Sequence, residues 1–187
     1  LLTVLNERIF YNDGVPVPLN IVTIAGASNE IPDADDGLDA FFDRFLLKYQ
    51  IKSIQDAGNF ARLLTMKGKL PEPRNTISLG DIHEAQDQLS RIELPPAVME
   101  QIIKVRESIR DKVTSVSDRT FRTSIRILQA DAWLRGSKTI ELTSIELFQH
   151  ICWAKPEQIR SIQSLILELI APEKNKVMTL YNEIKKI

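Results

Sequence analysis

The sequence predicts a mainly α-helical protein with a small α/β part near its N-terminus. Two short apolar runs rich in branched residues, 21–28 and 45–51, flank a loop rich in Pro and Asp and a short amphipathic helix. This pattern is typical of parallel strands in an α/β sheet. From Ser78 onward, apolar residues recur at helical spacing behind capping signals, which predicts a series of helices.

The N-terminal segment predicts the end of a helix followed by a β-hairpin. Residues 1–6 have the pattern of a last helical turn, and residues 8–12 have that of a strand. Asp13-Gly14 is a strong hairpin signal because both residue types tolerate positive φ. The returning strand, 15–19, carries prolines on alternate positions. Because proline cannot donate to a ladder, we expect an edge strand.

Two polar residues stand at the borders of the predicted parallel strands, where α/β sheets place their chemistry. Asn29 follows the first apolar run, and Arg44 precedes the second. An Asn amide can both donate and accept hydrogen bonds, and an Arg fork matches phosphate oxygens. Two simpler interpretations stay open. Asn29 could cap the following loop, and Arg44 could form a weak surface ion pair with Asp36, Asp39 or Asp43.

Residues 52–69 are mixed, with helical spacing in Phe60, Leu63 and Leu64. Glycine and proline then interrupt the pattern. We expect residues 70–76 to form the hinge between the α/β part and an all-helical part.

The second half of the chain carries clear helix start signals. They are Ser78 with Asp81, Pro95-Pro96, Ser117, Thr143 with Glu146, and Pro156, and Gly136 is a stop signal. Apolar stripes follow each start; those of the first three helices are Ile82, Ala85, Leu89 and Ile92, then Val98, Ile102, Val105, Ile109 and Val113, then Phe121, Ile125, Leu128 and Ala132. The later stripes are Leu147, Phe148, Ile151 and Cys152, then Ile159, Ile162, Leu165, Ile166 and Leu169, with a last pattern over 177–187.

Arg119 is a further candidate binding residue. It lies in the first turn of the helix that Ser117 caps, where a cation is slightly unfavourable. It therefore needs an anionic partner, which Asp118 alone could supply.

Composition narrows the function classes. The 187 residues carry a net charge of −1, with 43% hydrophobic and 26% charged residues, as in ordinary soluble proteins of one or two domains. Near-neutral charge gives no case for nucleic acid or an anionic membrane. The one cysteine, Cys152, excludes an internal disulfide and fits a reducing, cytoplasmic compartment. His83 and His150 show no metal-ligand spacing, so we expect surface or packing roles for them and no metal site.

Several short motifs resemble a known family. Residues 27–30 (ASNE) and 42–45 (FDRF) resemble the sensor 1 and arginine-finger segments of AAA+ ATPases. The opening LLTVLNERIF resembles the MoxR family, and VSDR (116–119), LQADA (128–132) and CW (152–153) resemble its RavA branch. Nearly the whole chain takes part, and the order of the motifs carries the resemblance. Because the seven glycines form no G-x-x-x-x-G-K-[ST], we expect the chain to be the inactive C-terminal portion of a longer protein.

The resemblance implies an organisation and roles. Residues 1–69 would be the end of a AAA+ α/β core with a pre-sensor hairpin and two parallel strands, 70–154 the helical lid, and 155–187 the start of a further helical domain. Asn29 would position the attacking water, and Arg44 would act on the ATP of a neighbouring subunit. Arg119 would be the sensor 2 residue that contacts nucleotide from the lid. Glu7 and Arg8 also match the family and would make a contact across the subunit boundary.

The resemblance also implies cofactors and partners. ATP and Mg²⁺ would bind between subunits of a hexameric ring, and hydrolysis would remodel or regulate a partner protein. RavA-like proteins work with a von Willebrand A-domain protein and bind an inducible lysine decarboxylase. The hairpin would reach toward the pore or a neighbour, or would merely shield a sheet edge. The alternative from another class is a non-catalytic helical interaction or regulatory module.

Overall fold

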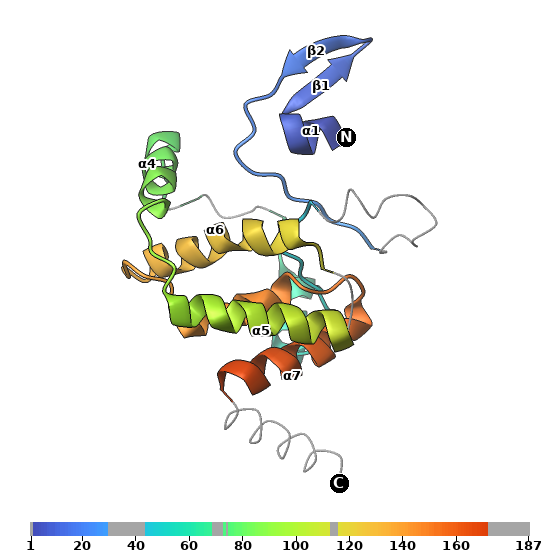
Figure 1. The fold of residues 1–187 in the computed structure, drawn as a ribbon. Helices are drawn as coiled ribbons and strands as arrows, with labels where there is room; N and C mark the ends of the chain where they lie inside the picture. The colour runs from blue at the N-terminus through green and yellow to red at the C-terminus, as the bar shows by residue number, and fades with distance from the viewer. Residues whose placement is uncertain (1, 30–43, 69–72, 74, 113–115, 172–187) are drawn as a thin grey trace. The chain divides into compact units, whose positions relative to one another are not determined.

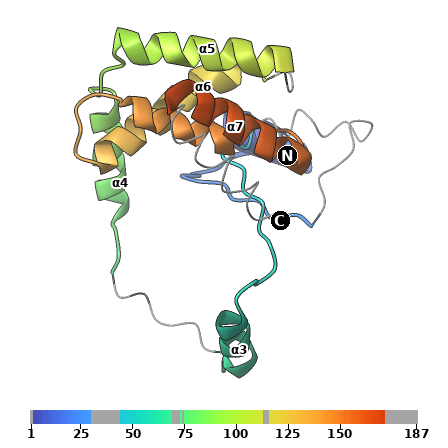
Figure 2. The same cartoon turned by 90° about the horizontal axis from the view of Figure 1, so that it is seen from below.

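The computed structural model shows a largely helical chain (Figures 1 and 2). It describes residues 2–29, 44–68, 73, 75–112 and 116–171. By its internal contacts the chain divides into two compact units, Leu1–Lys48 and Tyr49–Ile187, and each is described by itself.

The first unit begins with a short helix and the predicted hairpin. Helix α1 (Leu2–Glu7) leads into strands β1 (Ile9–Asn12) and β2 (Val15–Pro18), which pair antiparallel with Ile9 opposite Pro18. Asp13 and Gly14 have φ of 49° and 83°, the positive values that a tight primed turn requires. The hairpin prediction is confirmed. Its apolar residues remain exposed, among them Phe10, Tyr11, Val15 and Val17.

The two predicted parallel strands are not present as strands. Residues 21–28 and 45–51 are described without any strand assignment, and residues 22–28 are exposed rather than buried. Branched apolar residues favour a strand, but a strand forms only where a neighbour completes its hydrogen-bond ladder. Within the described residues no other strand lies in such a ladder with them. The amphipathic helix predicted between the two runs falls outside the described residues.

Helix α3 (Ala57–Thr65) opens the second unit. Asp56 caps it by accepting a hydrogen bond from the backbone N–H of Asn59 at 2.7 Å. No residue of this helix is buried. Its large apolar side chains, Phe60, Leu63 and Leu64, are at least half exposed. Most of the predicted hinge over 70–76 lies outside the described residues.

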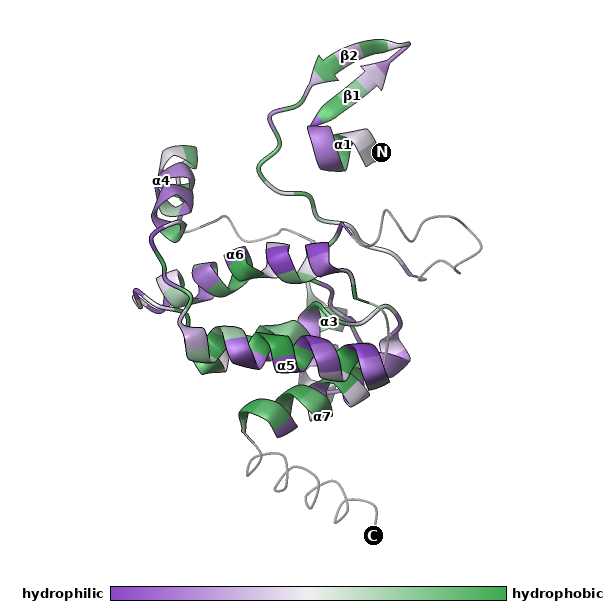
Figure 3. Cartoon of the chain, viewed as in Figure 1, coloured by the Kyte–Doolittle hydropathy of each residue, from purple (hydrophilic) through white to green (hydrophobic). Residues whose placement is uncertain are grey.

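The remaining elements form a helical bundle. They are α4 (Leu79–Leu89), α5 (Pro96–Lys112), α6 (Asp118–Leu134), the 3₁₀ helices η2 (Leu142–His150) and η3 (Pro156–Gln158), and α7 (Ile159–Ile170). Helix α7 packs on η2 and α5, and α6 packs on η2 and α4. Figure 3 shows α7 as largely hydrophobic, in keeping with its place against two other elements.

The core of the bundle follows the predicted stripes. The side chains of Val105, Ile109 and Leu128 are fully buried, and the Phe121 ring lies 5.5 Å from that of Phe148. Other buried members are Ile92, Val98, Ile102, Ala132, Ile140, Ile145, Ile151, Cys152, Trp153, Ile162, Leu165 and Ile166. Helical spacing therefore identified the buried faces of α5, α6 and α7 correctly.

The caps of α4 and α6 also match their predictions. The Ser78 hydroxyl accepts from the Asp81 backbone N–H at 3.0 Å, and the Asp81 carboxylate accepts from the Ser78 N–H at 2.9 Å. The Ser78 hydroxyl also donates to the Asp81 carboxylate at 2.7 Å. This hydrogen bond, together with the one from the Ser78 backbone N–H, lowers the pKa of Asp81 below its ordinary value. Ser117 caps α6 through the Thr120 N–H at 3.2 Å. Gly136, with φ of 73°, follows the end of α6.

The predicted helix start at Thr143 with Glu146 is wrong in type and position. The element is a 3₁₀ helix whose N-cap, Glu141, makes no side-chain capping bond. The Thr143 hydroxyl instead donates to the Glu141 carboxylate at 3.3 Å. The next hydroxyl, from fully buried Ser144, donates to Asp131 of α6 at 2.6 Å. The Ser144 hydroxyl therefore forms its hydrogen bond with another helix, α6. A local capping pattern in the sequence cannot reveal such a contact.

A short parallel bridge joins the connection before α5 to the connection after α6. The Glu93 N–H donates to the Lys138 carbonyl at 3.1 Å, and the Ile140 N–H donates to the Glu93 carbonyl at 2.9 Å. Thr139 is the residue that lies opposite Glu93 in this bridge. Among the described residues, no helix is both long and apolar enough to cross a bilayer.

Candidate functional site

Arg44, the predicted arginine finger, is bound by a side chain from the start of the chain. Its Nε donates a hydrogen bond of 2.7 Å to the Oδ1 of Asn6. Arg44 is half-buried, and Asn6 is exposed in the last turn of α1. Sequence reasoning missed Asn6, although it directly precedes the Glu7-Arg8 pair that matched the family motif.

The end of α1 fixes where Asn6 lies. Arg8 has φ of 57°, a left-handed conformation that is uncommon for a residue other than glycine and that ends a helix. Its carbonyl accepts from the Leu19 N–H at 2.7 Å, so the base of the hairpin closes directly after the helix. No described contact tests the predicted subunit contact of Glu7 and Arg8, which stays a prediction.

The residue after Arg44 packs against the segment that leads to Asn29. A Cβ placed on Gly26 would lie 3.4 Å from Cε1 and Cζ of Phe45. The two segments expected to be neighbouring strands thus lie in contact, although neither is a strand. Asn29 itself is exposed, at the last described position before residues 30–43. Its water-positioning role stays a prediction.

Arg119 lies exposed in the first turn of α6, as predicted. Asp118, which the sequence suggested as an anionic partner for Arg119, forms an ion pair with Arg106 of α5. Arg106 Nε lies 2.7 Å and Nη2 2.6 Å from Asp118 Oδ1. This ion pair ties the beginning of α6 to α5, and the Arg119 carbonyl accepts from the Thr123 hydroxyl at 2.9 Å. Asn29 and Arg44 belong to the other unit of the chain.

Comparison with known families decides the relationship. Residues 1–91 match a family described as the MoxR domain in the MoxR-vWA-beta-propeller ternary systems, and residues 97–166 match the AAA lid domain. The chain belongs to the MoxR family of AAA+ ATPases. The first match contains Asn29 and Arg44, and the second contains Arg119.

Two curated relatives come from Methanocaldococcus jannaschii. The uncharacterized protein MJ0812 is 27% identical over the whole chain, which covers 51% of its length. The uncharacterized protein MJ0079 is 25% identical, also over the whole chain, and 50% of its length is covered. The chain therefore spans about half the length of the curated relatives it matches.

The matches support the MoxR relationship independently of the short sequence motifs. They do not support every finer prediction. The matched descriptions name MoxR and lid domains without naming the RavA branch, so that branch stays a prediction. The lid match runs into α7, which packs in the same core as α5 and η2. The expected domain boundaries at 69/70 and 154/155 stay predictions.

The other candidate groups of this MoxR-family chain have packing or surface roles. His150 stacks on Tyr49 with ring centroids 4.5 Å apart, and burial lowers the pKa of its imidazole. His83 is exposed on α4, and Cys152 is fully buried, as expected. In the part of the chain that the structure describes, no group of three His, Cys, Asp or Glu side chains could hold a metal ion.

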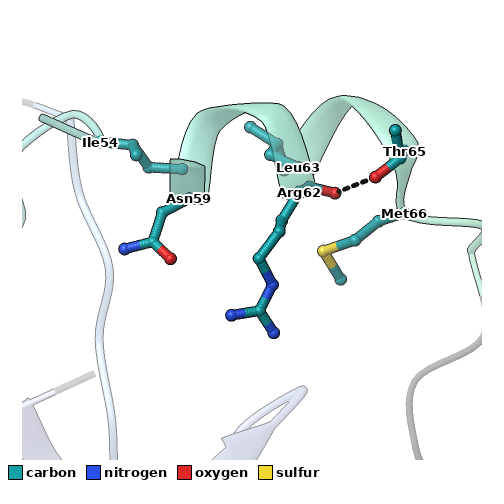
Figure 4. A pocket seen from close by; sticks show the side chains of 6 residues that line it. All are labelled: Ile54, Asn59, Arg62, Leu63, Thr65 and Met66. Carbon is teal, nitrogen blue, oxygen red and sulfur yellow. Dashed lines mark hydrogen bonds between the residues drawn. The ribbon is translucent and has the colours of Figure 1, made fainter. Parts of the chain in front are cut away.

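A shallow surface hollow beside α3 was not predicted. Figure 4 shows the polar side chains of Asn59 and Arg62 and the thioether of Met66 on one side of the helix. Every lining residue is exposed: Ile54, Asn59, Arg62, Leu63, Thr65 and Met66. The hollow therefore has the character of an open surface rather than that of an enclosed ligand pocket.

Proposed function

We propose that the protein containing this chain is a cytoplasmic, hexameric ATPase that hydrolyses ATP at subunit interfaces to remodel or regulate protein partners. The observation that carries the proposal is the paired match of the chain to a MoxR domain and a AAA lid domain. We assign this activity to the whole protein and not to the isolated chain.

Within this proposal, three side chains serve phosphoryl transfer. The amide of Asn29 would orient the attacking water of its own subunit. Arg44 would stabilise the charge that develops on the phosphate of a neighbouring subunit, a contribution of about 10³- to 10⁵-fold in rate. Arg119 would bind nucleotide from the lid, at the beginning of α6, where the Arg106–Asp118 ion pair holds the helix.

ATP and Mg²⁺ are the proposed cofactors. The groups proposed from this chain are two guanidinium groups and an amide, which suit phosphate oxygens and water. Magnesium prefers carboxylate, phosphate and water oxygens. We therefore assign to this chain contacts with the phosphates and the attacking water, and none with the metal ion.

The family description also suggests partners. Because the matched family belongs to MoxR-vWA-beta-propeller systems, we propose that the whole protein acts with a von Willebrand A-domain protein and a β-propeller protein. The inducible lysine decarboxylase is expected only if the protein belongs to the RavA branch.

The test uses the full-length protein and its ATP turnover. Arg44→Ala and Asn29→Ala are each expected to lower kcat strongly. The effect of Arg119→Ala is compared with that of Arg122→Ala, a control substitution at an exposed position on the same helix, α6. Mixing Arg44→Ala subunits with Asn29→Ala subunits is the decisive step. If Arg44 acts on the neighbour and Asn29 on its own subunit, some mixed interfaces contain both wild-type residues, and turnover recovers partially.

Three results would contradict the proposal or one of its parts. Full-length protein without ATP turnover would favour the non-catalytic interaction module. Turnover that persists in the Arg44→Ala variant would remove this residue from the catalytic site. Turnover that is lost in both variants but does not recover on mixing would place both residues on the same side of the interface.

A further inference from the structure

We propose that Asn6 is a positioning residue that orients the guanidinium of Arg44 for its action at the subunit interface. This inference rests on the role proposed for Arg44. Its observation is the 2.7 Å hydrogen bond from Arg44 Nε to Asn6 Oδ1. The two residues lie far apart in sequence, so the contact is made by the fold rather than by local chain geometry.

The hydrogen bond restricts the conformational freedom of the Arg44 side chain, which otherwise limits arginine as a catalytic group. An Arg side chain has many rotamers, and its planar fork acts on phosphate oxygens only in a defined orientation. A fixed acceptor on Nε restricts the last torsions of the side chain and sets the plane of the guanidinium. Pre-organised charge of this kind contributes most to transition-state stabilisation.

Both partners are attached to ordered neighbours. Asn6 lies in the last turn of α1, whose end is set by the left-handed Arg8 and by the Leu19–Arg8 hydrogen bond. On the other side, Phe45 packs over Gly26 directly after Arg44. The acceptor and the arginine backbone are therefore each held by contacts of their own.

The bond is exposed, which separates a positioning role from a merely structural one. An exposed hydrogen bond contributes little to stability because water replaces it readily. Loss of Asn6 should therefore leave the melting temperature nearly unchanged. A large effect on turnover would then come from the orientation of Arg44.

The test is a double-mutant cycle in the full-length ATPase, with kcat and KM for ATP as readouts. Asn6→Leu removes the acceptor at similar volume, whereas Asn6→Asp keeps an acceptor oxygen. We expect Asn6→Leu to lower kcat on the order of tenfold, with KM within about twofold, and Asn6→Asp to remain near wild type. Asn59→Leu, the same change at an exposed position on α3, is the control.

The cycle distinguishes the failure of this inference from the failure of the proposed function. If Arg44→Ala does not lower kcat, the proposed role of Arg44 is wrong. If Arg44→Ala lowers kcat but Asn6→Leu does not, only the positioning role is wrong. The role is also overturned if Asn6→Asp is as slow as Asn6→Leu, or if Asn6→Leu slows the Arg44→Ala protein by the same factor as wild type. The expected result is that the double variant is no slower than Arg44→Ala alone.

Discussion

Leu128 and Leu134 provide a matched pair for testing the core of the helical bundle. Both lie on α6, and the side chain of Leu128 is 0% exposed whereas that of Leu134 is 76% exposed. Changing either residue to alanine alters intrinsic helix propensity by a similar, small amount. The difference between the two variants therefore reports burial alone.

The expected magnitude follows from that difference in burial. Leu128→Ala removes side-chain atoms that have no contact with water and leaves a cavity, which costs about 2–5 kcal/mol of unfolding free energy. Leu134→Ala should change the unfolding free energy by less than about 0.5 kcal/mol. With a urea m-value of about 2 kcal/mol/M, the Leu128→Ala midpoint should fall by about 1–2.5 M.

Tryptophan fluorescence is the assay of choice. The sequence has two tryptophans, Trp133 and Trp153, and both lie in the second unit, with Trp153 only 5% exposed. Urea unfolding followed by fluorescence therefore reports on the bundle and not on the hairpin unit. Equal midpoint shifts for the two variants, or a shift below about 0.3 M for Leu128→Ala, would show that the buried face of α6 has been assigned wrongly.

Two further predictions concern the cap of α4 and the pH response. Ser78→Ala removes the hydroxyl that accepts from the Asp81 N–H and should cost about 1 kcal/mol; faster amide exchange in α4 would support this, and unchanged exchange would contradict it. Burial lowers the pKa of His150 below its ordinary 6.5, so the folded state binds its proton less readily than the unfolded state. The stability from neutral His150 is then complete above about pH 6.5 and is lost as the pH falls through the folded-state pKa. His150→Phe, which can still stack on Tyr49, should remove this part of the pH dependence, as urea midpoints at pH 5 and pH 8 would reveal; an unaltered pH dependence would refute it.

Local signals predicted the elements whose cause is local. The primed turn at Asp13-Gly14 and the capping box of Ser78 with Asp81 each need only neighbouring residues, and both are present. The buried faces of α5, α6 and α7 were also predictable, because helical periodicity records which side of a helix avoids water.

Features that depend on distant partners were not predictable in the same way. The apolar run 21–28 has the composition of a strand, but its conformation depends on neighbours to complete a ladder. The buried Ser144 hydroxyl bonds to Asp131 on another helix. At the candidate site, Arg44 could be predicted from its motif, whereas Asn6 became visible only when the fold brought the two residues together.

The bridge between Glu93 and Thr139 carries a consequence for folding kinetics. Its hydrogen bonds join segments on either side of both α5 and α6, so a long loop must close before they can form. We therefore expect folding φ-values near zero at Glu93 and Ile140, because these bonds form after the transition state. Contacts of this kind slow unfolding without accelerating folding. Removing the bridge would then raise the unfolding rate of the bundle more than it would lower the folding rate.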